Sequence, residues 1–176
     1  MQLKNLVVLS LLGGAFAQSA ATLSTITDGF SSISSALDTL DTAVKGLTGG
    51  ADAAKQTADV TSKSEAVAAA INAATAKITG AKDTLALTDA LGVSTASDKL
   101  LEKTNTVITD LIGKKDVIAK ANQAATVKSQ LATQEKASNA LADAIVAKMP
   151  TLAQSIAKSK AAKISEAIAK GVTAFT

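Results

Sequence analysis

The sequence of 176 residues contains no cysteine and no histidine. Without cysteine the chain has no disulfide bond and no thiol redox chemistry, so the packing of its secondary structure must hold the fold together. Without histidine it lacks the usual base of a nucleophilic catalytic triad. Lysine replaces that base in some hydrolases, but in pairs such as Ser159-Lys160 the two side chains are adjacent on a helix and point to different faces. We therefore expect the protein not to be an enzyme.

Arginine, tryptophan and tyrosine are also absent, and the chain has only 3 phenylalanines. The missing guanidinium groups remove the usual bidentate ligands of phosphates and guanines, and the scarcity of aromatic rings removes stacking platforms for sugars and bases. Candidate metal ligands are reduced to carboxylates such as Asp38 and Asp41, which are neighbours on one predicted helix surface and match no calcium loop. We expect no nucleic-acid partner, no metal and no cofactor.

The residues that are abundant favour helices and a packed core. Apolar residues make up 47% of the chain, mostly as alanine with leucine, valine and isoleucine, and disordered chains are far less apolar. Alanine, leucine and lysine are strong helix formers, so the composition favours an all-helical protein of one domain. The formal net charge is only +3, which points to no strongly charged partner.

The N-terminal segment has the features of a secretory signal peptide. A single basic residue, Lys4, precedes an apolar run, and the small residues Ala15 and Ala17 fit the pattern of a cleavage site. The apolar run is well short of the roughly 20 residues that span a bilayer, so we expect no transmembrane segment after processing. No lipid-anchor signal is visible at the other end, which favours release from the cell or non-covalent association with the cell wall. The predicted units are a signal peptide at 1–17 and a single helical-bundle domain at 18–176.

Apolar residues recur at alternating spacings of three and four along most of the chain, the pattern of amphipathic helices. No segment shows the period of two that marks a strand facing a core. Glycines and the single proline separate the periodic segments, so the connections are short and an antiparallel bundle of about five helices is the expected fold. The predicted helices cover 23–47, 52–79, a segment from about Leu100 to Gly113, a segment bearing Val127 to Ile145, and 151–175.

Two stretches between these helices are less regular. The loop at 81–87 leads to Thr88 and Asp89, which we expect to cap a short turn that ends near Gly92, before the third helix begins. The segment from Asp116 to Ala121 is predicted as a short helix, either separate from the long helix that follows or continuous with it.

The polar face of the first predicted helix is rich in hydroxyl groups, where glutamate and lysine are more usual. One interpretation is a weakly charged face that contacts water. The other is a surface for O-linked sugars added in a secretory pathway, since the sequence has no N-x-Ser/Thr motif. The residues concerned include Ser24, Thr25, Thr27, Ser31, Ser32, Ser34, Ser35, Thr39 and Thr42.

Three segments, taken in order, resemble a known family. Leu87–Gly92, Asp110–Lys115 and Gln134–Pro150 are similar to segments of the fungal hydrophobic surface-binding protein A and cell-wall galactomannoprotein family, and the similarity extends over nearly the whole predicted mature chain. The resemblance implies a secreted helical bundle that adsorbs to hydrophobic solids and, in some members, encloses a fatty acid between its helices. It also implies, for some members, recruitment of a secreted esterase to a surface or attachment of mannose.

The residues alone support a binding function less sharply than the resemblance does. A core of alanine and aliphatic side chains with few aromatic rings can keep internal volume for an apolar ligand or open onto an interface, although the same stripes also suit an ordinary core. We therefore predict a hydrophobic surface, a fatty acid or another lipid as the partner. The alternatives are a structural O-mannosylated cell-wall protein and, among enzymes, a serine hydrolase. The candidate residues for contact with the apolar ligand, chosen near helix middles, are Phe30, Ile33, Leu37, Val67, Ile71, Val107, Leu111, Leu131, Leu141, Ile145, Ile164 and Ile168.

Overall fold

The computed structural model describes the backbone of residues 4–176 and the side chains of residues 19–176. The predicted signal peptide at 1–17 lies outside the residues whose side chains are described, so it stays a prediction. Every regular element in the described part of the chain is a helix, which confirms the all-α class. The elements are α1 (Lys4–Lys45), the 3-10 helix η1 (Gly50–Asp52), α2 (Ala53–Gly80), α3 (Leu87–Gly113), α4 (Lys115–Lys120), α5 (Ala124–Lys148) and α6 (Thr151–Ala174).

The described chain has six α-helices, where about five were predicted. The additional one is α4, a helix of 6 residues that is separate from α5. The break lies at Asn122, whose φ of 57° is in the left-handed region that asparagine tolerates better than most residues. The five long helices agree with the five principal helices expected from the apolar spacing.

The predicted interruption at Gly92 is wrong, because α3 runs unbroken from Leu87 to Gly113. Gly92 is exposed, and a Cβ placed there would meet nothing within 4 Å. The glycine therefore destabilises the helix only through its poor helix propensity, by about 1 kcal/mol relative to alanine. Burial of Ala90 and Val93 on either side of it outweighs that cost.

The predicted cap residues Thr88 and Asp89 lie inside the first turn of α3, and Ala86 takes the N-cap position without a side-chain hydrogen bond. Asp89 instead accepts a hydrogen bond of 2.6 Å from the hydroxyl of Ser19 in α1. The backbone N–H of Ala86 donates to that same hydroxyl at 2.8 Å. These contacts fasten the start of α3 to α1.

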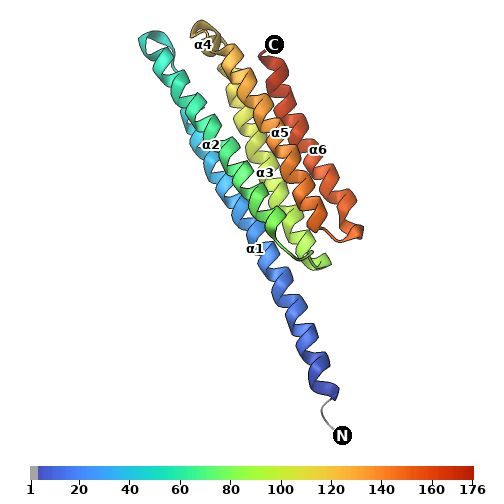
Figure 1. The fold of residues 1–176 in the computed structure, drawn as a ribbon. Helices are drawn as coiled ribbons and strands as arrows, with labels where there is room; N and C mark the ends of the chain where they lie inside the picture. The colour runs from blue at the N-terminus through green and yellow to red at the C-terminus, as the bar shows by residue number, and fades with distance from the viewer. Residues whose placement is uncertain (1–3) are drawn as a thin grey trace.

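The five long helices form a closed ring in the order α1, α2, α5, α6, α3, in which each helix packs against two neighbours. Successive long helices alternate in direction along the chain (Figure 1). Neighbours in the ring do not all alternate, because α1 and α3, α3 and α6, and α2 and α5 run the same way. The antiparallel contacts are those of α1 with α2 and of α5 with α6.

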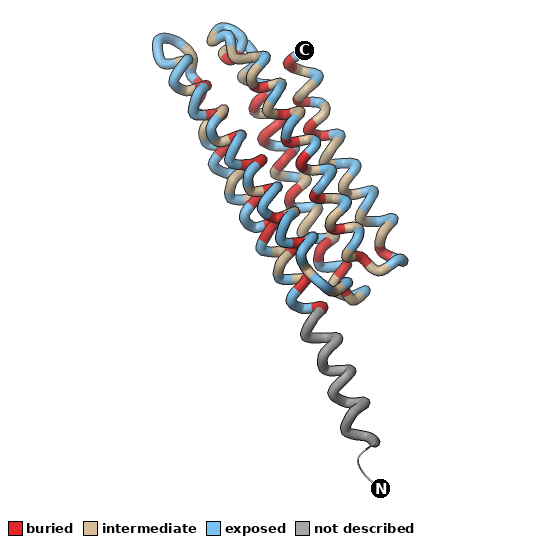
Figure 2. Tube along the Cα trace, in the orientation of Figure 1, coloured by how far each residue is buried: buried red, intermediate tan, exposed pale blue. Residues whose placement is uncertain are grey.

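The apolar stripes of the helices face the inside of the ring, where the buried residues lie in Figure 2. The core is mostly aliphatic, and both aromatic residues of the predicted mature chain, Phe30 and Phe175, are buried as expected. The closest backbone approach that a glycine permits is between α1 and α2. A Cβ built on Gly29 would lie 2.9 Å from the Cβ of Ala74, so only glycine fits without movement of a helix.

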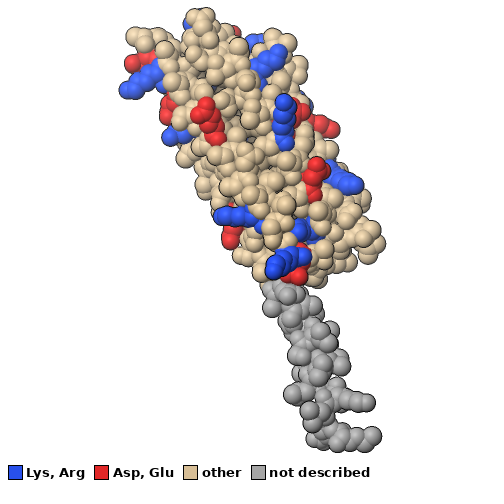
Figure 3. All heavy atoms as spheres, viewed as in Figure 1, with Lys and Arg blue, Asp and Glu red and all other residues tan. Residues whose placement is uncertain are grey.

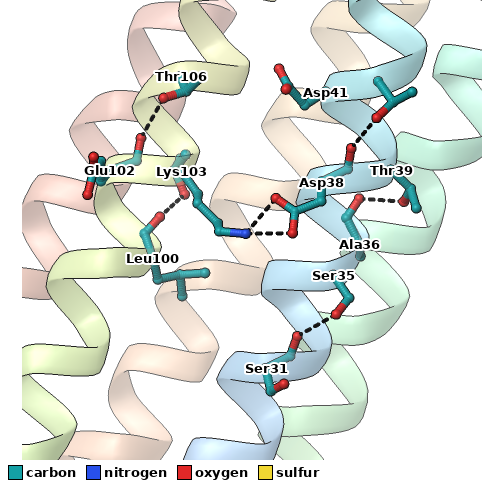
Figure 4. A network of polar contacts seen from close by, with 12 residues as sticks. Ser31, Ser35, Ala36, Asp38, Thr39, Asp41, Leu100, Glu102, Lys103 and Thr106 are labelled. Atoms are coloured by element: carbon teal, nitrogen blue, oxygen red, sulfur yellow. Dashed lines mark hydrogen bonds and ion pairs between the residues drawn. The ribbon is translucent and has the colours of Figure 1, made fainter.

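Charged side chains of both signs are interspersed over the face shown in Figure 3. Two ion pairs link α1 with α3: Nζ of Lys103 lies 2.5 Å from both carboxylate oxygens of Asp38 (Figure 4), and Nζ of Lys45 lies 3.4 Å from Oδ2 of Asp110. The hydrogen bond from Lys45 to Asp41 raises the pKa of Lys45 above its ordinary value. None of the described helices is long and apolar enough to cross a membrane.

Candidate functional site

An apolar cavity lies inside the helix ring, and all five long helices contribute side chains to it. Its volume is about 120 Å³, counted as the space open to the centre of a water molecule. A single water needs only about 10–15 Å³ on the same measure. Protein interiors are close-packed and contain few voids larger than one water, so this cavity is far more than a packing defect.

All twelve residues predicted to contact an apolar ligand line this cavity. Eleven of them are buried and one, Ile164, is half-buried. Their contact with a ligand stays a prediction. Grouped by helix, they are Phe30, Ile33 and Leu37 in α1, Val67 and Ile71 in α2, Val107 and Leu111 in α3, Leu131, Leu141 and Ile145 in α5, and Ile164 and Ile168 in α6.

The sequence prediction missed the residues at one end of the cavity, where α3 and α6 begin. Leu87 and Leu91 of α3 and Leu152 and Ile156 of α6 line the cavity, yet they are 50%, 60%, 80% and 46% exposed. They are four of the five exposed large apolar side chains in the described part of the chain. We call these four residues the rim, because they mark where the cavity opens to solvent.

The opening lies along the first half of α6, where Ala153 is the one buried residue, whereas the second half has Ala167, Ile168 and Gly171 buried. There Gly171 is buried, and a Cβ built on it would lie 3.0 Å from Leu131 of α5 and 3.1 Å from Ile108 of α3. In the first half, the stripe residues Leu152 and Ile156 are exposed although they continue the same apolar pattern. The beginning of α6 therefore forms a loosely packed wall of the cavity.

One polar pair is buried in the cavity wall between α2 and α5. The side-chain nitrogen Nε2 of Gln134 donates hydrogen bonds to the carbonyl and hydroxyl oxygens of Ser64, at 3.0 and 2.7 Å. Gln134 is only 4% exposed, so these bonds satisfy both of its amide protons in apolar surroundings. The pair fixes the register of α2 against α5 and places neutral polar groups in the cavity wall.

Among the described residues that line the cavity, one carries a charge, and this is Lys160 of α6. Its ammonium forms an ion pair with Asp98 of α3. Asp98 is exposed and does not line the cavity, whereas Ser94 and Ser97 on the same helix do. The cavity therefore has a cationic group near its rim, beside two hydroxyl groups.

These features suit binding better than catalysis. The lining is mostly aliphatic, and within the described part of the chain no group of three or more acidic, histidine or cysteine residues lies together where it could hold a metal ion. The arrangement can shield a hydrocarbon chain from water and present one ammonium group to a polar head.

A family model described as hydrophobic surface binding protein A matches residues 23–147. The chain belongs to this family. The match begins near the first residues of α1 that enter the bundle and ends in the last turn of α5. It confirms the resemblance found in the sequence.

Two curated relatives of this family member, from two Aspergillus species, carry the name cell wall mannoprotein 1. The protein from Aspergillus flavus is 38% identical over 149 residues, and that from Aspergillus fumigatus is 35% identical over 145 residues. The alignments cover 85% and 82% of this chain but 52% and 49% of those proteins. The chain thus spans about half the length of the curated relatives it matches.

Several solved structures share the fold. Ligand binding domain 1 of the Penicillium marneffei MP1 protein, complexed with arachidonic acids, has a TM-score of 0.81 and 20% identity, with 88% of this chain and 99% of that chain covered. AfMP4p in complex with palmitic acid has a TM-score of 0.80 and 21% identity, with the same coverage of 88% and 99%. At these identities the likeness establishes the fold of this family member.

Proposed function

We propose that this protein binds a single-chain lipid, such as a long-chain fatty acid, inside its helix ring, and that it has no catalytic activity. The observation that carries the proposal is the aliphatic cavity, which all five long helices line. The fatty acids held by similarly folded proteins support it. Each methylene group that leaves water contributes about 0.8 kcal/mol, so affinity should rise with chain length more than it depends on any single polar contact.

The test is native mass spectrometry of the purified protein, followed by extraction and identification of any lipid that co-purifies with it. One lipid per chain, together with a higher melting temperature when palmitate is added, is the expected result. A lipid-free protein whose melting temperature does not change with saturating palmitate would contradict the proposal.

We also propose that the rim adsorbs the protein to hydrophobic surfaces, because it gathers exposed apolar side chains at one end of the bundle. The double substitution Leu152→Ser with Ile156→Ser should weaken adsorption to hydrophobic beads about tenfold or more, since each side chain contributes roughly 1 kcal/mol when half of its area is buried. Depletion of the protein from solution by a bead titration measures the effect.

Ile112 provides the matched control for this prediction. It is 37% exposed but lies at the other end of α3, outside the cavity lining. Ile112→Ser should leave adsorption unchanged. Equal losses in the rim variant and in Ile112→Ser would mean that adsorption uses the whole surface and not the rim.

Secretion, with a signal peptide at 1–17 and one folded domain at 18–176, remains part of the proposal. The contacts of Ser19 with Asp89 and Ala86 support it, because they hold the chain to the bundle directly after the predicted cleavage point. N-terminal sequencing of the secreted protein tests this point. Recruitment of a secreted esterase is a further prediction from the family resemblance, tested by asking whether a bead coated with this protein retains the esterase.

A structural O-mannosylated cell-wall protein is the second candidate function. It is favoured by the exposure of the hydroxyl-bearing residues Ser31, Ser35 and Thr39 on the outer face of α1, and by the relatives named as mannoproteins. The hydroxyls of Ser35 and Thr39 only donate to backbone carbonyls of their own helix (Figure 4), so a sugar there would disturb no tertiary contact. A secreted protein with the mass of the bare chain would rule this candidate out.

A further inference from the structure

Lys160 of α6 and Asp98 of α3 form an ion pair. Among the described contacts it is the one side-chain polar contact between α6 and α3. The two partners are placed differently: the side chain of Lys160 is 26% exposed and lines the cavity, whereas that of Asp98 is 52% exposed and lies outside the lining. The side chain of Lys160 therefore belongs to the cavity lining, while its ammonium reaches a carboxylate at the surface.

The surroundings of Lys160 suit a ligand that has an anionic head and an apolar tail. Ser94 and Ser97 of α3 line the wall beside it, and the aliphatic residue Ile164 lies one turn further along α6. An ammonium group has three donors, and its hydrogen bonds to a carboxylate are strengthened by charge. The exposed Asp98 returns to water at little cost when another carboxylate takes its place.

We infer that Lys160 binds the carboxylate of a long-chain fatty acid at the mouth of the cavity, exchanging Asp98 for the ligand while the acyl chain lies among the aliphatic side chains. This inference rests on the proposed function and adds to it the chemical class of the head group and the residue that recognises it. The exchange keeps Lys160 paired before and after binding, so the apolar wall never holds an unpaired charge. It also predicts that ligands with a neutral head bind more weakly than fatty acids of the same chain length.

The test compares two probes of equal chain length, palmitate and hexadecanol, each delivered from cyclodextrin and measured by isothermal titration calorimetry. The wild-type protein should prefer palmitate about tenfold, the effect of one hydrogen-bonded charge pair. Lys160→Met keeps the aliphatic stem and should bind both probes equally, with its affinity for hexadecanol unchanged. Asp98→Asn removes the competing carboxylate and should raise the affinity for palmitate about threefold.

Lys103→Met is the matched control, because it removes the ion pair of α3 with Asp38, and neither of these two residues lines the cavity. It should change neither affinity. A purely structural ion pair would instead make Lys160→Met weaken both probes alike, which would overturn the inference. The inference also fails if the wild-type protein binds the two probes equally, whereas failure of both probes to bind would overturn the proposed function itself.

Discussion

Replacing Ala161 with tryptophan should abolish fatty-acid binding by this protein and leave its helical fold intact. Ala161 lies in α6, is half-buried and lines the cavity. An indole ring placed there occupies space that the acyl chain would otherwise fill. If the ring excludes about four methylene groups of palmitate from the cavity, at about 0.8 kcal/mol each, the affinity for palmitate falls about 200-fold. Filling a cavity with an apolar ring also tends to stabilise a fold, so the melting temperature without ligand should be unchanged or higher.

The adjacent residue supplies the control for this substitution. Ala162 is exposed and is not part of the cavity lining, so Ala162→Trp adds the same ring to the outside of the same helix. Titration calorimetry with palmitate should give the wild-type affinity for Ala162→Trp and no measurable heat for Ala161→Trp. A folded Ala161→Trp protein that binds palmitate as tightly as the wild type would place the ligand outside the ring.

The largest effect on stability is expected from Gly29→Leu. A Cβ at Gly29 already lies 2.9 Å from the Cβ of Ala74, and neither backbone can yield without moving α1 from α2. Overpacking of this kind costs about 3 kcal/mol at the upper end of its usual range. For a chain of this size that loss lowers the melting temperature by about 6–12 °C, which thermal unfolding followed by far-UV circular dichroism measures.

Gly92→Leu separates the close contact from the general effect of replacing a helical glycine. A Cβ at Gly92 meets nothing within 4 Å, so leucine there gains helix propensity of up to about 0.8 kcal/mol without a clash. Its melting temperature should equal or exceed that of the wild type. If Gly29→Leu also unfolds at the wild-type temperature, α1 and α2 do not approach each other as closely as described.

The helices could be predicted because each carries an apolar stripe that few polar residues, such as Ser64 and Gln134, interrupt. In the stripe predicted over 23–47, Leu23 is half-buried, and the later positions are buried from Ile26 in α1 to Leu47, which lies just after the end of α1. The predicted interruption of α3 was wrong because Gly92 was interpreted as the end of a short turn. The local signal of one glycine is about 1 kcal/mol, and the burial of Val93 and Leu100 beyond it is worth more.

The order of the helices around the ring could not be predicted, because the stripes are chemically alike. Any aliphatic stripe packs acceptably against any other, and nothing in the sequence pairs α2 with α5 in particular. The contacts that distinguish neighbours are few and polar, such as Gln134 with Ser64 and Lys160 with Asp98. Residues of these types are common on helix surfaces, so the sequence does not show which residues pair, and the partners become known only from the fold.

The candidate site could be predicted for the middle of the cavity but not for its mouth. Inward positions near helix centres line any space inside a bundle. For that reason the twelve predicted residues line the cavity. The rim residues Leu152 and Ile156 belong to the same periodic stripe as the buried Ile168. Periodicity shows which face of a helix is apolar, but it does not show where along the helix the packing against its neighbours becomes loose.

A ring with five members has a geometric consequence for the size of ligand it can admit. Helix axes packed about 9 Å apart at the corners of a regular pentagon lie about 7.7 Å from its centre, and the helices themselves reach inward by about 5–6 Å. The remaining bore is about 4 Å wide, close to the contact distance between carbon atoms and hence to the thickness of one polymethylene chain. With the same spacing, the axes of four helices in a square would lie about 6.4 Å from the centre, so their side chains would nearly fill the bore. The protein should therefore accept acyl chains of many lengths and degrees of unsaturation but refuse fused rings such as those of sterols.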